Sequence, residues 1–252
     1  MSALRRVAAP IGVAAAVLLV YLVNPWFQPD GALNQAVTVA FWILSILLVV
    51  ALFEDRKDHD ADNVEIEGPA FARFLFNNSR AGLLWLPIRL FLGFSWLDAG
   101  ISHVTDPKWM SAGASLRAYW ERAAAIPEQG RPPITYEWYR DFINVLLQGH
   151  HESWFSWLIA FGEIAVGVGL ILGCLTGIAA FFGALMNMSF LLAGSASTNP
   201  ILFTLAVGLM LAWKVAGYYG VDRWLLPRLG TPWRPGVQTR RGEPAPRGVP
   251  AG

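Results

Sequence analysis

Several ionisable residues lie deep inside long apolar segments of this 252-residue chain. Arg89 and Asp98 fall in one such segment, Glu163 in a second and Lys214 in a third. A charged side chain at the centre of a bilayer costs roughly 2.5–3.5 kcal/mol even on the lenient insertion scales. A hydrophobic anchor does not need such residues. We therefore expect them to pair, to line a polar cavity or to take part in chemistry.

Three of these residues are predicted to form one charged layer. With a rise of about 1.5 Å per residue, Lys214, Arg89 and Glu163 lie about 8, 10 and 13 Å from the same end of their helices. An Arg89–Glu163 pair would cancel much of the buried charge, and Asn187 could add an amide from slightly higher. Two interpretations stay open for the pair: a structural contact that sets the helix register, or a site that handles protons or electrons. Lys214 could also extend its side chain to the interface.

A second polar layer is predicted nearer the opposite face, with Asp98 at about 24 Å and His103 at about 31 Å. An imidazole there can carry a proton or attract an anion near neutral pH. No metal site is predicted, because the histidines lack the spacing typical of metal ligands. The candidate catalytic residues are Glu163, His103 and Asp98, and the candidate cofactor-binding residues are Arg89, Trp96 and Asn187.

The composition indicates an integral membrane protein. Hydrophobic residues make up 55% of the chain and charged residues only 15%, against about 25% charged residues in soluble domains. A net charge of +1 and the lack of a basic, aromatic-rich patch argue against a nucleic-acid partner. Cys174 is the only cysteine, so dithiol exchange within one chain, an iron–sulfur cluster and covalently bound haem are not expected.

The apolar segments predict an all-α, multi-pass membrane protein with about six transmembrane helices. The six expected spans are 6–24, 34–53, 82–104, 154–172, 175–195 and 200–220. No small-residue cleavage site follows the first, so we expect it to be retained. Twelve Lys and Arg residues lie on one side of this arrangement and five on the other. This asymmetry predicts a protein of the cell inner membrane with both termini in the cytoplasm.

The chain divides into four predicted regions. They are a two-helix membrane hairpin (1–53), an acidic cytoplasmic link ending in an interfacial helix (54–81), a four-helix membrane core (82–228) and a disordered Pro-, Gly- and Arg-rich tail (229–252). Within the core, the long outer segment 105–153 holds two amphipathic stretches, about 109–125 and 136–149. Glycines in the core helices, among them Gly93, Gly100 and Gly167, are expected to allow close helix approach.

Four motifs in the core resemble the DoxX/DoxD superfamily over about residues 82–228. They are Arg89-Leu-Phe-Leu-Gly-Phe-Ser-Trp-Leu-Asp-Ala-Gly-Ile-Ser-His103 with Asp106-Pro107, then Glu163-Ile-Ala-Val-Gly-Val-Gly-Leu-Ile-Leu-Gly173, the stretch 187–200, and Ala216-Gly-Tyr-Tyr-Gly-Val-Asp-Arg-Trp-Leu-Leu-Pro227. The chain departs from the family pattern at His103, where Lys is frequent, and at Gly177, where a basic residue is usual. The resemblance implies a four-helix membrane core. Its DoxD branch is a subunit of membrane thiosulfate:quinone oxidoreductase.

The resemblance implies a subunit that passes electrons from thiosulfate or another small sulfur anion to membrane quinone, together with redox partner subunits. We expect the quinone, the only cofactor predicted, to lie near Trp96 and Glu163. Glu163 or His103 would handle the protons that accompany its reduction. The competing hypothesis is a non-catalytic membrane scaffold or assembly subunit that docks redox partners through its link and tail. A transporter ranks third, because the core shows no pair of broken helices.

Overall fold

The computed structural model describes residues 3–23, 31–55 and 68–231. The regular elements in these ranges are all helices, without a strand. The chain forms two compact units, Met1–Glu67 and Gly68–Gly252, and each is described by itself. The all-helical class predicted from the apolar segments is therefore confirmed.

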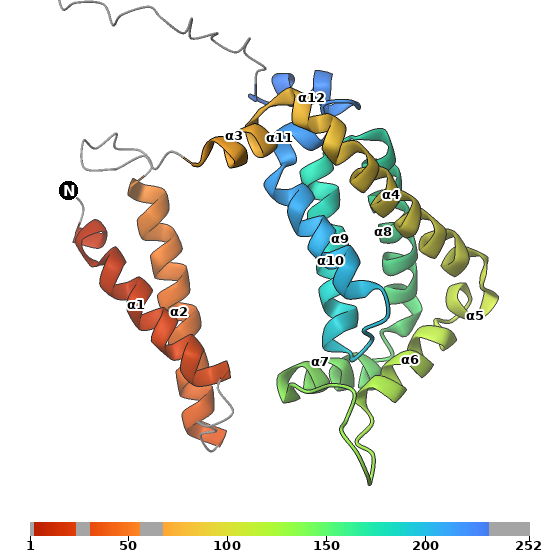
Figure 1. The fold of residues 1–252 in the computed structure, drawn as a ribbon. Helices are drawn as coiled ribbons and strands as arrows, with labels where there is room; N and C mark the ends of the chain where they lie inside the picture. The colour runs from red at the N-terminus through yellow and green to blue at the C-terminus, as the bar shows by residue number, and fades with distance from the viewer. Residues whose placement is uncertain (1–2, 24–30, 56–67, 232–252) are drawn as a thin grey trace, which may run out of the picture. The chain divides into compact units, whose positions relative to one another are not determined.

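The first unit is a pair of helices that lie side by side, α1 (Ala3–Val23) and α2 (Gly31–Asp55) (Figure 1). The segment Gly31–Val50 has a mean hydropathy of 2.1, and none of it is buried within the structure. Such a surface suits lipid rather than water. The acidic part of the predicted link, 56–67, and the tail from 232 onward lie outside the described residues.

The second unit is a bundle of four long helices that run alongside one another (Figure 1). They are α4 (Gly82–Thr105), α8 (Glu152–Leu172), α9 (Thr176–Leu192) and α10 (Asn199–Leu211). Among the described residues, three stretches are long and apolar enough to cross a membrane: one each in α2 and α8, and the one that α4 forms with the short turn before it. The helices α9 and α10 are apolar but shorter, with 17 and 13 residues. The structure thus supports a membrane protein without confirming six spans.

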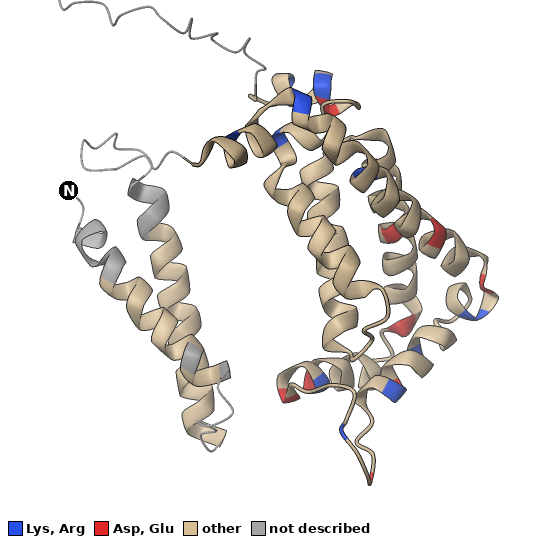
Figure 2. Ribbon diagram, in the orientation of Figure 1, with Lys and Arg blue, Asp and Glu red and all other residues tan. Residues whose placement is uncertain are grey.

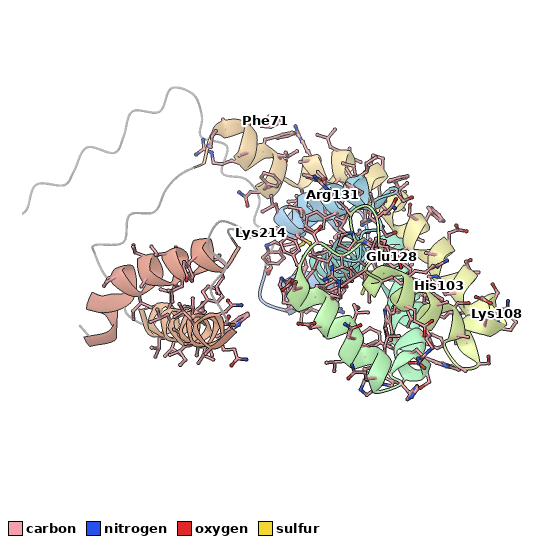
Figure 3. The ribbon with its side chains drawn as sticks, turned by 90° about the horizontal axis from the view of Figure 1, so that it is seen from below. Phe71, His103, Lys108, Glu128, Arg131 and Lys214 are labelled. Carbon is pink, nitrogen blue, oxygen red and sulfur yellow. The ribbon has the colours of Figure 1, made fainter. Side chains whose placement is uncertain are left out.

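The last predicted span, 200–220, is wrong as one continuous helix. Helix α10 ends at Leu211, and two short helices follow, α11 (Trp213–Ala216) and α12 (Asp222–Arg228). Gly217 and Gly220 lie between α11 and α12 and favour a turn there, since glycine is a poor helix former. Lys214 therefore lies on the exposed side of α11 (Figure 3), where its ammonium stands 5.9 Å from the Trp213 ring. It takes no part in a buried charged layer.

Glycines allow α4 and α8 to approach closely, as predicted, and their contacts set the register of the two helices. A Cβ added at Gly93 would lie 3.1 Å from the Gly167 carbonyl oxygen, and one at Gly100 would lie 3.0 Å from the Ala160 carbonyl oxygen. The two backbones are therefore in contact. This register places Glu163 beside the second half of α4, near Gly100. Arg89 lies eleven residues before Gly100, or about 16 Å along the helix.

The predicted Arg89–Glu163 pair is therefore wrong. Equal residue counts give equal depths only if the helices begin at one level. Gly93 of α4 instead packs against Gly167 and Ile171, close to the end of α8. The first residues of α4 therefore extend beyond the end of α8. A helix-by-helix count cannot detect such an offset, since it depends on which small residues meet.

The two ends of the bundle carry short helices (Figure 1). One end holds α3 (Ala70–Asn77), α11 and α12, and the other holds α5 (Pro107–Met110), α6 (Ala114–Ala124) and α7 (Glu137–Gln148). Helices α6 and α7 match the two amphipathic stretches expected in 105–153, and their inner faces form one buried cluster with Trp109. Helix α3 is joined to the bundle by the Trp85 indole, which donates to the Leu75 carbonyl at 2.9 Å. Charged residues gather mainly toward these two ends (Figure 2).

Candidate functional site

The structure brings together two of the three predicted catalytic residues. His103 lies in the last turn of α4 and Glu163 in the middle of α8, and His103 Nδ1 stands 2.6 Å from Glu163 Oε2. Glu163 is 1% exposed and His103 is 26% exposed. A short contact between an imidazole and a carboxylate is among the stronger hydrogen bonds in proteins. The pair thus joins a buried carboxylate to a side chain that solvent can reach.

The His103 ring is held in a fixed orientation. It stacks on Trp109 with ring centroids 3.7 Å apart and planes inclined by 13°. The Trp109 indole donates to the Ser156 carbonyl at 2.9 Å. Asp106 places this tryptophan, because its side chain caps α5 by accepting from the Lys108 amide at 2.9 Å. A clamped imidazole with one nitrogen on a carboxylate can hold a proton on its second nitrogen and release it toward solvent.

Arg89 belongs to a separate site at the α11–α12 end. Its guanidinium is buried and donates to the Ala216 carbonyl at 3.3 Å and to the Tyr219 carbonyl at 3.2 Å. The glycines Gly173 and Gly220 leave room for it, because a Cβ at either position would collide with Arg89 Nη1. Arg89 therefore ties the turn after α11 to α4. This arrangement accounts for its charge without a carboxylate in direct contact.

Sequence reasoning missed the role of Asp222 beside this turn. Its carboxylate accepts from the Leu175 amide at 2.7 Å and the Thr176 amide at 2.9 Å, and so caps the start of α9. A carboxylate at a helix N-terminus satisfies free amides and the helix dipole. The capping residue lies 46 residues after Thr176. A cap supplied from so far along the chain leaves no local pattern to recognise.

The remaining predicted residues are not brought to either site. Asp98 lies on the exposed face of α4, away from Glu163. Trp96 and Asn187 are buried in the bundle core, with Trp96 Nε1 against Gly183 of α9. Trp96 Nε1 and both polar atoms of the Asn187 side chain lack a hydrogen-bond partner in the structure. Both residues are therefore part of the packed core between the helices.

A long apolar groove runs between α8 and α9, with a volume of about 870 Å³. We call it the α8–α9 groove. Residues of α6 and α7 line one end of it, and Cys174 and Leu175, in the turn after α8, line the other. Its walls are small, aliphatic and aromatic side chains, including Gly162, Ala165, Val168, Gly169, Ile178, Phe182, Leu185 and Met186. At 100° per residue, Gly162 and Gly169 project from a different face of α8 than Glu163. The groove and the His103–Glu163 pair therefore flank one helix.

The groove has phenol groups at its α6–α7 end. The Tyr139 hydroxyl donates to the Ser189 carbonyl at 2.9 Å. The Tyr119 hydroxyl is buried near Ser195 but makes no well-formed hydrogen bond. Burial raises the pKa of Tyr119 to about 12. The groove thus combines a long apolar channel with hydroxyl groups at one end, which suits a molecule with a long apolar chain and an acceptor head group.

His150, among the described histidines, lies beside charged residues at the α6–α7 end. His150 Nδ1 lies 3.1 Å from Arg117 Nη1, and Arg117 also donates to Glu152 at 3.0 Å. Across the described ranges, no three His, Cys, Asp or Glu residues stand close enough to hold a metal ion.

No known protein family, curated protein or solved structure matches this chain. The DoxX/DoxD resemblance therefore rests on the motif residues alone.

Proposed function

We propose that this chain is the membrane subunit of a quinone-linked oxidoreductase and that the α8–α9 groove holds the quinone. The groove is the observation that carries the proposal. A membrane quinone joins a flat head with carbonyl acceptors to a long isoprenoid tail, and the groove offers an apolar channel lined at one end by Tyr119 and Tyr139. Bound quinone would supply two-electron, two-proton redox chemistry at this position.

The proposed position differs from the one predicted by sequence. Trp96 and Glu163, which were expected to flank the quinone, face other parts of the bundle and do not line the groove. Gly162 provides space instead, whereas a Cβ at Gly169 would already lie 3.2 Å from the Ala179 Cβ. A Cβ at Gly162 would meet only the Met186 sulfur, at 3.8 Å. Pockets of this kind, apolar with few polar groups, are the usual form of ligand sites.

His103 and Glu163 supply the proton chemistry in this proposal. The exposed edge of His103 exchanges a proton with solvent at the end of the bundle that carries α5, α6 and α7. Glu163 Oε2 accepts a hydrogen bond from the imidazole in its protonated form. A positively charged imidazole there would also attract a small sulfur anion. If the donor is thiosulfate, as the resemblance implies, two ions join through a new S–S bond and release the two electrons that the quinone accepts. The charge asymmetry of the loops would place this end outside the cytoplasm.

The competing function, a non-catalytic membrane scaffold, is favoured by one observation. Arg89 and Asp222 are engaged by backbone groups and serve the fold. If the His103–Glu163 pair is structural as well, the buried charged residues Arg89, Glu163 and Asp222 all serve the fold. An ordinary lipid acyl chain would then fill the α8–α9 groove.

The two functions are separated by what the groove retains. The full-length protein, purified with native lipids, should carry quinone detectable by mass spectrometry. Gly162→Leu fills the groove and should remove most of this quinone, while the matched Gly162→Ala should keep it. Equal amounts of quinone in the two variants, or phospholipid alone in the wild type, would contradict the proposal.

A further inference from the structure

One face of α4 points away from the rest of its bundle. Its residues recur every three or four positions, as expected for one side of a helix. They are Leu84, Pro87, Phe91, Phe94, Asp98 and Ile101, and all are exposed. We call this set the outer α4 face. Phe94 is 59% exposed, which suits contact with lipid or with another apolar helix. Asp98 lies on the same face, and its carboxylate suits contact with another helix but not with lipid.

Asp98 lies deep within the apolar span. Asp98 stands nine residues after Arg89 and seven residues before Thr105. Arg89 is level with the turn at the α11–α12 end, and α4 ends at Thr105. These separations correspond to about 13 Å and 10 Å along the helix. Ionisable residues at such depth normally face a bundle interior or a water-filled cavity and are paired. Asp98 instead sits on the outside of its own unit.

The hydroxyls of Ser95 and Thr105, which flank Asp98 along the helix, do not satisfy this carboxylate. The Ser95 hydroxyl donates to the Phe91 carbonyl at 2.9 Å. The Thr105 hydroxyl donates to the Ile101 carbonyl at 2.9 Å. Both hydroxyls are thus used by the backbone of α4 itself, which is the usual way such groups are satisfied in apolar helices. The partner of Asp98 has to come from a surface that covers the outer α4 face.

We infer that the outer α4 face docks a transmembrane helix of another protein that carries a Lys or Arg near the middle of the bilayer. A cation is the group that best offsets a carboxylate in hydrocarbon. Residues 7–53 of this chain contain no Lys, Arg or His. A second copy is disfavoured, because a two-fold axis along the bilayer normal would bring two Asp98 carboxylates to the same depth. The inference is independent of whether the groove holds quinone.

Model transmembrane peptides test this inference directly. The full-length protein carries a donor dye at its N-terminus and is reconstituted in phosphatidylcholine vesicles. Acceptor-labelled Leu/Ala peptides contain one central Lys, one central Leu, or one Lys moved two turns toward an end. Energy transfer should show the central-Lys peptide associating about tenfold more tightly than the other two. Asp98→Asn should remove the preference, whereas Ser102→Ala, a change of an exposed polar residue on the same helix, should keep it.

Three results would overturn the inference. They are equal association of all peptides, no association of any, and a Lys preference that survives Asp98→Asn. Thermal unfolding of both variants shows that they remain folded, so that a lost preference is not due to misfolding. Mixing donor- and acceptor-labelled copies of the protein tests the alternative occupant. Self-association that disappears in Asp98→Asn, without a Lys preference, would show that the outer α4 face joins two copies.

Discussion

The two sides of α8 use glycine in opposite ways. Toward α4, a Cβ added at Gly167 would lie 2.7 Å from the Leu97 amide nitrogen, so the absence of a side chain lets two backbones touch. Toward α9, a Cβ at Gly162 would meet only the Met186 sulfur, at 3.8 Å, and the space belongs to the α8–α9 groove. A small residue in a membrane helix can therefore allow close backbone contact or leave open space, depending on the position of the neighbouring helix.

The polar groups follow the same division. On the packed side, the side chain of Glu163 is 1% exposed and lies against His103. The groove side is apolar along its length and has phenols only at its α6–α7 end. We propose that the His103–Glu163 pair on the packed side transfers protons and that the α8–α9 groove binds a lipophilic molecule. Changes on the two sides should therefore differ in kind: those on the first should affect stability and those on the second should affect binding.

The largest difference is expected when one substitution is made on each side. Gly167→Leu forces α4 and α8 apart, because the new atoms meet backbone that cannot move aside. We expect a loss of about 4 kcal/mol or more, or failure to fold. Gly162→Leu extends into the groove and should change stability by less than about 1 kcal/mol. Thermal unfolding of both proteins in the same detergent measures this, and equal destabilisation would remove the distinction between the two sides.

The next largest effect concerns the His103–Glu163 pair. His103→Leu leaves a buried carboxylate without its imidazole and should cost about 2–3 kcal/mol, less than a fully buried pair because solvent reaches one partner. Glu163→Leu should also destabilise the protein. The double variant should recover much of either loss, as expected for groups that interact directly. A double-mutant cycle measures the coupling, and strictly additive losses would show that the contact contributes nothing.

The smallest effect is expected on the outer α4 face. Asp98→Leu removes a carboxylate that no contact within the bundle stabilises, so the purified protein should be unchanged or more stable by up to about 1 kcal/mol. His103→Leu, on the same helix, should move stability in the opposite direction. A clear loss of stability in Asp98→Leu would mean that this residue already has a partner within the chain.

The apolar segments were sufficient to predict the helices, because a helix in lipid must satisfy its own backbone. The close approach of another helix at Gly93 also followed from residue type. The offset between α4 and α8 did not, since it arises from contacts between residues far apart in the chain. For the same reason the cap that Asp222 supplies to α9 could not be predicted. The α8–α9 groove depends on how two helices diverge, which no residue pattern within either helix encodes.

The central claim, that the α8–α9 groove holds a quinone, is tested most directly by photolabelling. A quinone analogue with a photoreactive tail is bound to the full-length protein in native-lipid particles, and the labelled peptides are identified by mass spectrometry. We predict adducts on α8 and α9 around Ile159 and Met186, both of which line the groove. Excess unlabelled quinone should suppress them, excess phospholipid should not, and Gly162→Leu should abolish them. Labelling that persists in Gly162→Leu, or that phospholipid displaces as well as quinone does, would contradict the account.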